Sequence, residues 1–185
     1  MGNAAAGAGL AELMDGHTGA AGEWFARAVD RYRASWDGAP PGSWGRPFGM
    51  LKAHVLAADW DGAVRDAEWT LGLGAAEAES PIGRYAACLA LLVVGRDEEA
   101  RVLADGLRTH EGFPSEVGDA LATLAAQDVI AYTEAVESVL DSFETREEYL
   151  EDLPVADTVL VLQALAGCRS MAAELSSPLL PSSGV

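Results

Sequence analysis

Gly95-Arg96-Asp97-Glu98-Glu99-Ala100-Arg101 is the stretch of sequence that decides the fold, because it separates two segments with helical patterns. The preceding residues 82–94 are apolar on nearly every side, which predicts a central, buried helix. The following residues 102–107 carry apolar side chains at the spacing of a helix with one buried face. Since glycine interrupts helices, the sequence predicts a helical hairpin that turns at Gly95.

The same alternation of helical segments and breaks extends along the whole chain. Glycine and proline interrupt it, with aspartate and other turn residues, at 15–16, 37–42, 72–81, 112–114 and 153–154. Between these breaks the apolar residues recur at spacings of three and four, and no period-two alternation persists long enough for a strand. We therefore predict an all-α fold of antiparallel helical hairpins, with eight or nine helices in a single domain over residues 1–175 and a short flexible tail at 176–185.

Two further stretches are similar to the turn at 95–100. They are Ala58-Asp59-Trp60-Asp61-Gly62-Ala63 and, more weakly, Ile130-Ala131-Tyr132-Thr133-Glu134-Ala135. The final alanines of the three lie 37 and 35 residues apart, near the period of roughly 34 residues that tetratricopeptide units have.

The turn at 95–101 resembles the inter-helix turn of tetratricopeptide repeats, and the resemblance covers roughly residues 46–143. The chain departs from that family in its unequal repeat lengths and in lacking most of the Trp, Leu, Gly and Tyr positions of the first helix. The resemblance implies a superhelical scaffold whose concave face grips a partner. An irregular helical bundle with similar turns is the alternative.

The charge of the chain excludes some classes of partner. The net charge is −17, and residues 111–185 contain 14 acidic side chains but only two basic ones, Arg146 and Arg169. Nucleic-acid binding needs a basic face against the phosphates, and an anionic membrane surface repels an acidic one. We therefore expect no nucleic-acid or membrane partner, and we expect the acidic part of the chain to attract a basic protein. A surface that only keeps the protein soluble is the alternative.

The acidic segment of residues 147–152 is the first candidate for partner binding. Its carboxylates surround two apolar side chains, a pattern typical of an apolar anchor inside a charged ring; the carboxylates are Glu147, Glu148, Glu151 and Asp152, beside Tyr149 and Leu150. Trp44 and Trp60 are further candidates, because each lies in or near a turn where an exposed aromatic side chain can anchor an interface. A solvated acidic face, and tryptophans that cover the core, are the alternatives.

The C-terminal third has a second resemblance. A helical segment at 132–143, the acidic-aromatic stretch at 147–152, a helical segment at 155–166 and a final Ser/Pro/Leu segment follow in an order similar to the end of bacterial polymorphic-toxin immunity proteins of the family numbered forty-nine. That resemblance implies a cytoplasmic protein that neutralises a cognate toxin by binding it. A general tetratricopeptide-like scaffold or regulatory adaptor is the alternative, followed by a non-canonical enzyme or small-ligand binder with a helical pocket.

No residue pattern in the sequence predicts catalysis, a metal or a cofactor. The three histidines, His17, His54 and His110, lie far apart, and none has a metal-ligand spacing. Phosphate-binding glycine motifs and nucleophile elbows are missing too. We therefore predict a protein that is not an enzyme and that has no cofactor.

The start of the chain and its cysteines indicate a compartment. Residues 1–13 lack the basic and long apolar segments of a secretory signal, and the longest apolar run, 85–94, has only ten residues. Cys88 and Cys168 are isolated in apolar helical stretches, so we expect two buried free thiols. Together these features predict a cytoplasmic protein, and the arginine-rich, lysine-poor composition is typical of GC-rich bacterial genomes.

Overall fold

A computed structural model describes residues 2–182. Over this range the chain forms nine α-helices and two 3-10 helices and contains no strand, which confirms the predicted all-α fold of helical hairpins. The α-helices are α1 (Gly2–Met14), α2 (Thr18–Ala34), α3 (Gly45–Leu56), α4 (Trp60–Gly72), α5 (Pro81–Val93), α6 (Asp97–Arg108), α7 (Ser115–Ala125), α8 (Val129–Glu144) and α9 (Asp157–Gly167), and the 3-10 helices are η1 (Ala75–Glu77) and η2 (Leu150–Asp152).

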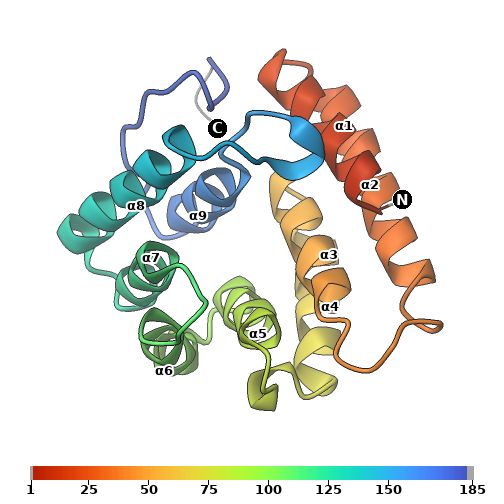
Figure 1. The fold of residues 1–185 in the computed structure, drawn as a ribbon, viewed down its shortest axis with the longest axis horizontal. Helices are drawn as coiled ribbons and strands as arrows, with labels where there is room; N and C mark the ends of the chain where they lie inside the picture. The colour runs from red at the N-terminus through yellow and green to blue at the C-terminus, as the bar shows by residue number, and fades with distance from the viewer. Residues whose placement is uncertain (1, 183–185) are drawn as a thin grey trace.

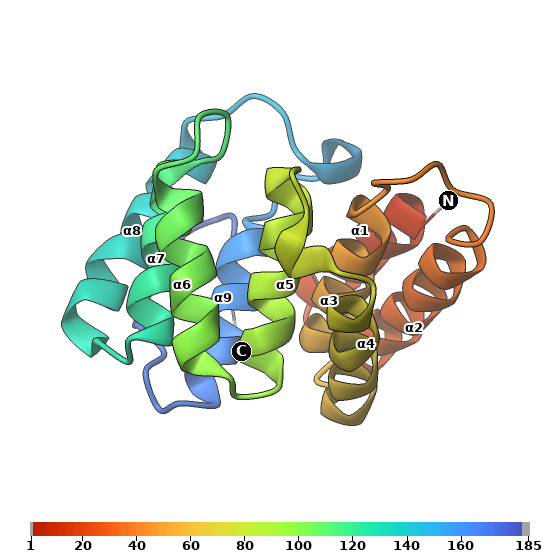
Figure 2. The ribbon, with the colours of Figure 1, turned by 90° about the horizontal axis from the view of Figure 1, so that it is seen from below.

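The first eight helices form four hairpins that follow one another around a curve (Figure 1). Each helix packs against its neighbours in the chain, and α3 also packs against α1 and α5, so the odd-numbered helices face the inside of the curve. Helix α9 lies on that inner side, where it packs against α3, α7 and α8 (Figures 1 and 2). The concave side is therefore filled over part of its length by the chain's own last helix.

One turn geometry recurs five times. In each turn a residue with positive φ donates its N–H to the carbonyl three residues earlier, and the next residue donates to the carbonyl five residues before it, which is the Schellman pattern of helix ends. The positive-φ residues are Gly16, Ala58, Gly95, Gln127 and Ser170. The similarity between the stretches at 58–63 and 95–100 therefore reflects one shared turn.

The third instance predicted at 130–135 is wrong in its register. The corresponding turn has Gln127 as its positive-φ residue, so the position equivalent to Ala63 and Ala100 is Tyr132, three residues before Ala135. The register is hard to find in the sequence because this turn contains no glycine.

The hydrophobic core has two connected parts. One contains most of α5 to α9, where Ala100, Leu121 and Leu162 are fully buried. The other joins α1, α2 and α3 around Leu10, Phe25 and Met50, and the beginning of α9 contributes Leu160 to it. Buried alanines, among them Ala63 and Ala100, stand where the helices of a hairpin cross closely.

Two further features differ from the sequence expectations. Helix α1 was not predicted, because three glycines hide it; two of them, Gly2 and Gly9, lie where a Cβ would come within 2.6 Å of an aromatic ring of α2. Cys168 is exposed, whereas the predicted buried thiol is found only at Cys88. Cys168 follows the end of α9, where the side chain has left the core.

The predicted flexible tail at 176–185 is packed as far as the structure describes it. Leu179 is buried, its carbonyl accepts a hydrogen bond of 3.0 Å from the N–H of Ala156, and Ser177 donates to the carboxylate of Glu144. Leucine side chains thus fasten the segment to α8 and α9, and residues 183–185 of the predicted tail lie outside the described range. No helix in residues 2–182 combines the length and apolar character that a membrane crossing requires.

Candidate functional site

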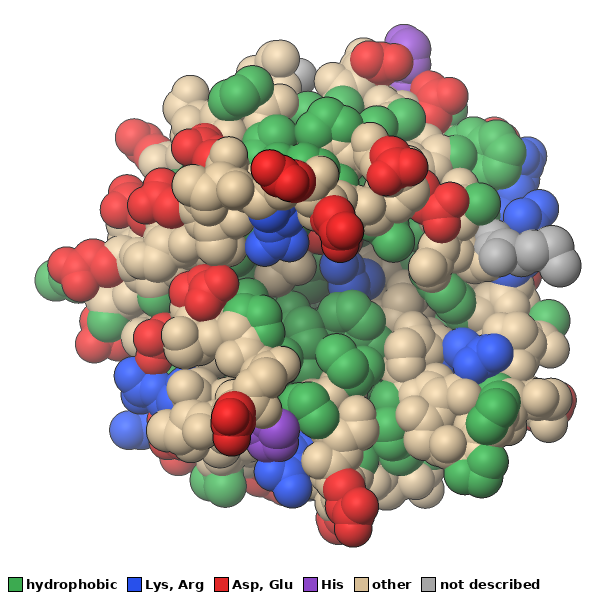
Figure 3. All heavy atoms as spheres, in the orientation of Figure 1, with side chains coloured by type: hydrophobic (Ala, Val, Ile, Leu, Met, Phe, Trp, Pro, Cys, Tyr) green, Lys and Arg blue, Asp and Glu red, His purple; other side chains and the backbone are tan. Residues whose placement is uncertain are grey.

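The concave side of the molecule is hollowed beside α9, as the space-filling view shows (Figure 3). Two chambers lie there, an inner one of about 330 Å³ and an outer one of about 830 Å³. They share four lining residues, Asn3, Tyr32, Gly45 and Ile82, so they form one continuous space. Helices α1, α2 and α3 supply most of the wall, while Ile82 of α5, Leu150 of η2 and Asp157 of α9 complete it.

The inner chamber is mostly apolar. Its walls include Leu10, Phe25, Phe48, Leu56 and Leu150. The ring of Tyr32 lines both chambers and packs closely against the backbones of α1 and α3, since a Cβ at Gly2 or Gly49 would approach that ring to 2.5–2.6 Å. Because these glycines have no side chain, the Tyr32 ring can pack against the two helix backbones and does not fill the inner chamber.

A charged pair lies in the wall of the inner chamber. Lys52, the single lysine of the chain, donates from Nζ to Oδ2 of Asp157 at 2.5 Å, and the two side chains are only 13% and 12% exposed. The ammonium also lies 5.2 Å from the centre of the Phe48 ring. Asp157 is the first residue of α9, so the positive end of the helix dipole stabilises its carboxylate.

Tyr32 supplies the other polar group of the inner chamber. Its hydroxyl donates to Oδ1 of Asn3 at 2.7 Å. Burial, with smaller contributions from the negative charges of Asp157 and Glu151, raises the pKa of Tyr32 to about 12. The hydroxyl therefore keeps its proton and acts as a donor throughout the neutral pH range.

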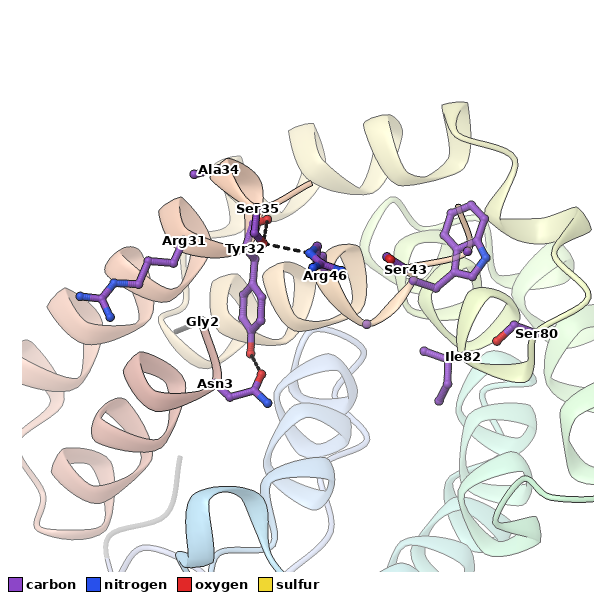
Figure 4. A pocket seen from close by; sticks show the side chains of 13 residues that line it. Gly2, Asn3, Arg31, Tyr32, Ala34, Ser35, Ser43, Arg46, Ser80 and Ile82 are labelled. Carbon is purple, nitrogen blue, oxygen red and sulfur yellow. Dashed lines mark hydrogen bonds between the residues drawn. The ribbon is translucent and has the colours of Figure 1, made fainter. Parts of the chain in front are cut away.

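The outer chamber is more polar and carries arginine (Figure 4). The Nε of Arg46 donates to Oγ of Ser35 at 3.0 Å, and that hydroxyl in turn donates to the carbonyl of Tyr32. Arg31 also borders the chamber, but its side chain points away from Arg46 in the close-up. Among the described residues, the terminal nitrogens of Arg46 have no hydrogen-bond partner.

The predicted acidic segment lies beside this hollow. Leu150 lines the inner chamber, and η2 packs against α1, so the loop crosses from α8 towards the N-terminal helices (Figure 1). Glu147, Glu148, Glu151 and Asp152 are exposed. The loop that carries these four exposed carboxylates therefore reaches the hollow at Leu150.

Tyr149 and Leu150 do not project as the predicted apolar anchor. The hydroxyl of Tyr149 donates to the carbonyl of Phe143 at 2.9 Å, and its half-buried ring packs against the core. Leu150 packs against the N-terminal cluster. Both side chains thus fasten the loop to the domain and leave its carboxylates outside.

The two candidate tryptophans occupy different places. Trp44 is half-buried and lines the outer chamber, where its ring centre lies 6.1 Å from that of Trp36. Trp60 packs against the core at the start of α4, in a separate depression with Arg169. Only Trp44 therefore shares a site with the acidic segment.

A second polar cluster joins α2, α3 and α4 away from the hollow. His54 is buried, and its ring nitrogens lie 2.8 Å from Oδ2 of Asp59 and 3.1 Å from Oδ2 of Asp66, whose other oxygen binds Arg33. A Cβ at Gly62 would come within 2.4 Å of the His54 ring. His54 thus holds the α3–α4 hairpin together, and it lines neither chamber of the hollow.

The sequence does not predict that several residues of the hollow belong to a site. Lys52 and Asp157 are 105 residues apart, and Asn3 lies in an N-terminal segment that was not expected to be helical. One available signal was the single lysine, whose position inside an apolar helical pattern is unusual. Within residues 2–182, no group of three or more His, Cys, Asp or Glu side chains has an arrangement that could hold a metal ion.

Comparisons with protein-family models, curated proteins and solved structures find no match to this chain. The tetratricopeptide and immunity-protein resemblances therefore stay predictions, and the chemistry of the site is argued from its own residues.

Proposed function

We propose that this chain is a protein-binding module that holds a basic partner on its concave side, and that it acts as an immunity protein which neutralises a cognate toxin in the bacterial cytoplasm by direct binding. The observation that carries the proposal is the position of the acidic loop. Four exposed carboxylates, at 147, 148, 151 and 152, stand beside a hollow with apolar walls, and a basic protein surface with an apolar side chain complements that combination.

The acidic surface continues from the loop onto α8. The exposed side of this helix carries a row of carboxylates at helical spacing, namely Glu134, Glu137, Asp141 and Glu144. Since α8 is the last helix of the stack of hairpins, no further hairpin covers this side (Figure 2). A polar outer side is what a terminal helix needs for solubility, and concentrated negative charge adds attraction for a basic protein.

The position of α9 favours a discrete site over an extended groove. A general scaffold or adaptor, which is the alternative function, uses a long open concave face for an extended peptide. Here α9 packs against α3, α7 and α8 on that face, so the hollow between α1, α3 and η2 is the part left open.

The test is affinity capture from an extract of the source cell. Wild type is compared with a rim variant, Glu147→Gln, Glu148→Gln, Glu151→Gln and Asp152→Asn, and with a control variant that neutralises four exposed carboxylates on other helices, Glu23→Gln, Asp61→Asn, Glu68→Gln and Asp105→Asn. Both variants lose four negative charges and therefore have the same net charge, but they lose them at different places.

We expect wild type and the control variant to retain the same basic protein at low salt and the rim variant to lose it. Co-expression of that protein should arrest growth unless the wild-type chain is present. If the rim variant retains the protein as well as wild type does, the proposed binding site is wrong. If expression of the retained protein is harmless, the proposed immunity role is wrong.

A further inference from the structure

We propose that the two chambers form a binding site for a small amphipathic carboxylate, with its apolar body in the inner chamber and its carboxylate between Lys52 and Arg46. This inference uses the same hollow as the protein-binding function proposed above, but it does not depend on that function. The volumes of about 330 and 830 Å³ lie in the range of small-molecule sites, which are typically about 300–1,000 Å³.

The charge of the lining is opposite to that of the whole molecule. The chain has a net charge of −17, yet Lys52 and Arg46 line the two chambers against a single carboxylate, Asp157. That carboxylate is already compensated by Lys52 and by the start of α9. The nearby Glu151 is exposed at the rim and does not line either chamber. The hollow thus favours an anion inside an acidic protein.

Several side chains that line the chambers have hydrogen-bond donors without a partner. An ammonium group has three N–H donors, and Asp157 is the one partner of Lys52 within residues 2–182. Within residues 2–182, the amide nitrogen of Asn3 and the terminal nitrogens of Arg46 have no hydrogen-bond acceptor. In contrast, Oδ1 of Asn3 and Oδ2 of Asp157 already accept hydrogen bonds from Tyr32 and Lys52. A ligand that fits must bring acceptor atoms, as a carboxylate does.

The buried ion pair is itself better explained by a ligand than by stability. The free-energy cost of removing two charges from water often exceeds the free energy that their attraction gains. A buried ion pair is therefore weak evidence for a contribution to the stability of the fold. An apolar pocket in which a few polar groups converge is typical of a small-molecule site. The rest of the inner chamber is lined by apolar side chains, which would contact the alkyl or aryl part of the ligand. They include Leu10, Phe25 and Leu56.

The experiment uses three probes with the same ten-carbon chain, namely decanoate, decyltrimethylammonium and decanol, below their micellar concentrations. Binding to the full-length protein is followed by calorimetry and by tryptophan fluorescence, since Trp44 lines the outer chamber. We expect saturable binding of one decanoate per chain, and binding of the cation and the alcohol that is at least about tenfold weaker.

Two classes of variant locate the binding. Arg46→Gln, and the double change Lys52→Met with Asp157→Leu, which leaves no unpaired charge, should each weaken decanoate binding by about tenfold or more. Arg65→Gln, an exposed arginine of α4 outside the chambers, is the matched control and should bind as wild type does. Ala6→Leu narrows the inner chamber and should abolish binding without changing the circular dichroism spectrum.

The rim variant separates this proposal from the previous one, because it should lose the protein partner and still bind decanoate. If the cation or the alcohol binds as tightly as decanoate, if decanoate fails to saturate, or if Arg46→Gln and Ala6→Leu both bind it like wild type, the proposed site is wrong.

Discussion

At the residue scale, glycines and short polar side chains decide how closely the helices of this protein approach. Gly62 lies against the His54–Asp59 pair, and Gly2 and Gly49 lie against the ring of Tyr32. The sequence predicts the helices that contain Gly49 and Gly62 but not the one that contains Gly2. It does not predict the side chains that meet these glycines, because those side chains lie on another helix or in a turn whose geometry has to be known first.

Gly62→Ala should destabilise the protein by about 2 kcal/mol, because the added Cβ would lie 2.1 Å from Oδ2 of Asp59 and 2.4 Å from the His54 ring. Gly22→Ala in α2 is the matched control. Its Cβ meets nothing within 4 Å, so the substitution should raise the free energy of unfolding by roughly 0.5–1 kcal/mol. Urea unfolding of both variants measures the difference, and equal effects would contradict the packing described for Gly62.

Asp59 should make stability depend on acidity. The hydrogen bond from the backbone N–H of Gly62, reinforced by His54, lowers the pKa of Asp59 below its ordinary value. A carboxylate whose pKa is lowered by folding contributes stability above its unfolded pKa, and that contribution is lost as the pH falls through the folded pKa.

Wild type should therefore exceed Asp59→Asn in stability at pH 6, by up to about 1 kcal/mol for so exposed a group, and the difference should shrink as the pH falls below about 4. Thermal unfolding of the two proteins between pH 3 and pH 6 measures it. The side chain of Asp61, in the first turn of α4, has no hydrogen bond to His54 or to the N–H of Gly62 within residues 2–182, so Asp61→Asn should have the smaller effect at pH 6. A difference that grows on acidification would contradict the assigned cause.

At the element scale, the recurring turn organises the fold. Wherever glycine occupies its positive-φ position, as at Gly95, the sequence indicates the turn directly. Where Ala58 or Gln127 takes that position, the turn is stabilised by the packing of the hairpin and the local sequence hides it. The sequence therefore shows the turn at 95–101 directly, whereas the pattern at 130–135 lies three residues after the equivalent positions of the third turn.

Reciprocal substitutions test the turn. Ala58 is exposed and holds φ at 53°, a region that penalises a Cβ by about 1–2 kcal/mol, so Ala58→Gly should stabilise the protein by about 1 kcal/mol. Gly95→Ala, at the equivalent position of the next hairpin and with φ of 73°, should destabilise it by a similar amount. Both are measured by denaturant unfolding, and shifts of the same sign would contradict the equivalence of the two turns.

At the scale of the whole molecule, the sequence predicts the helical hairpins and the acidic charge. The structure adds that α9 fills part of the concave side of the curved array of hairpins. Helix α9 is apolar on nearly all sides and buried, which indicates a central helix, yet the sequence does not reveal that it lies on the concave side. The contacts between α3 and α9 join residues about a hundred positions apart, and no local pattern encodes them. For the same reason the hollow, with Lys52 facing Asp157, could not be predicted.

The arrangement gives the molecule an uneven electrostatic field. Carboxylates gather on α8 and along the η2 loop, while the lining of the hollow has more basic than acidic side chains. Such a field accelerates encounter with a basic protein much more than it strengthens the final complex, and salt screens it over a Debye length of about 8 Å at physiological ionic strength.

The salt dependence of association with the captured partner tests the proposed docking most directly. Stopped-flow rates are compared for wild type, the rim variant and the control variant across a salt series. We expect the rim variant to associate at least about tenfold more slowly than wild type at low salt and to approach it at high salt, with the control variant nearer to wild type throughout. A rim variant with the rate and salt slope of wild type would contradict the claim that the acidic loop steers a partner into the concave side.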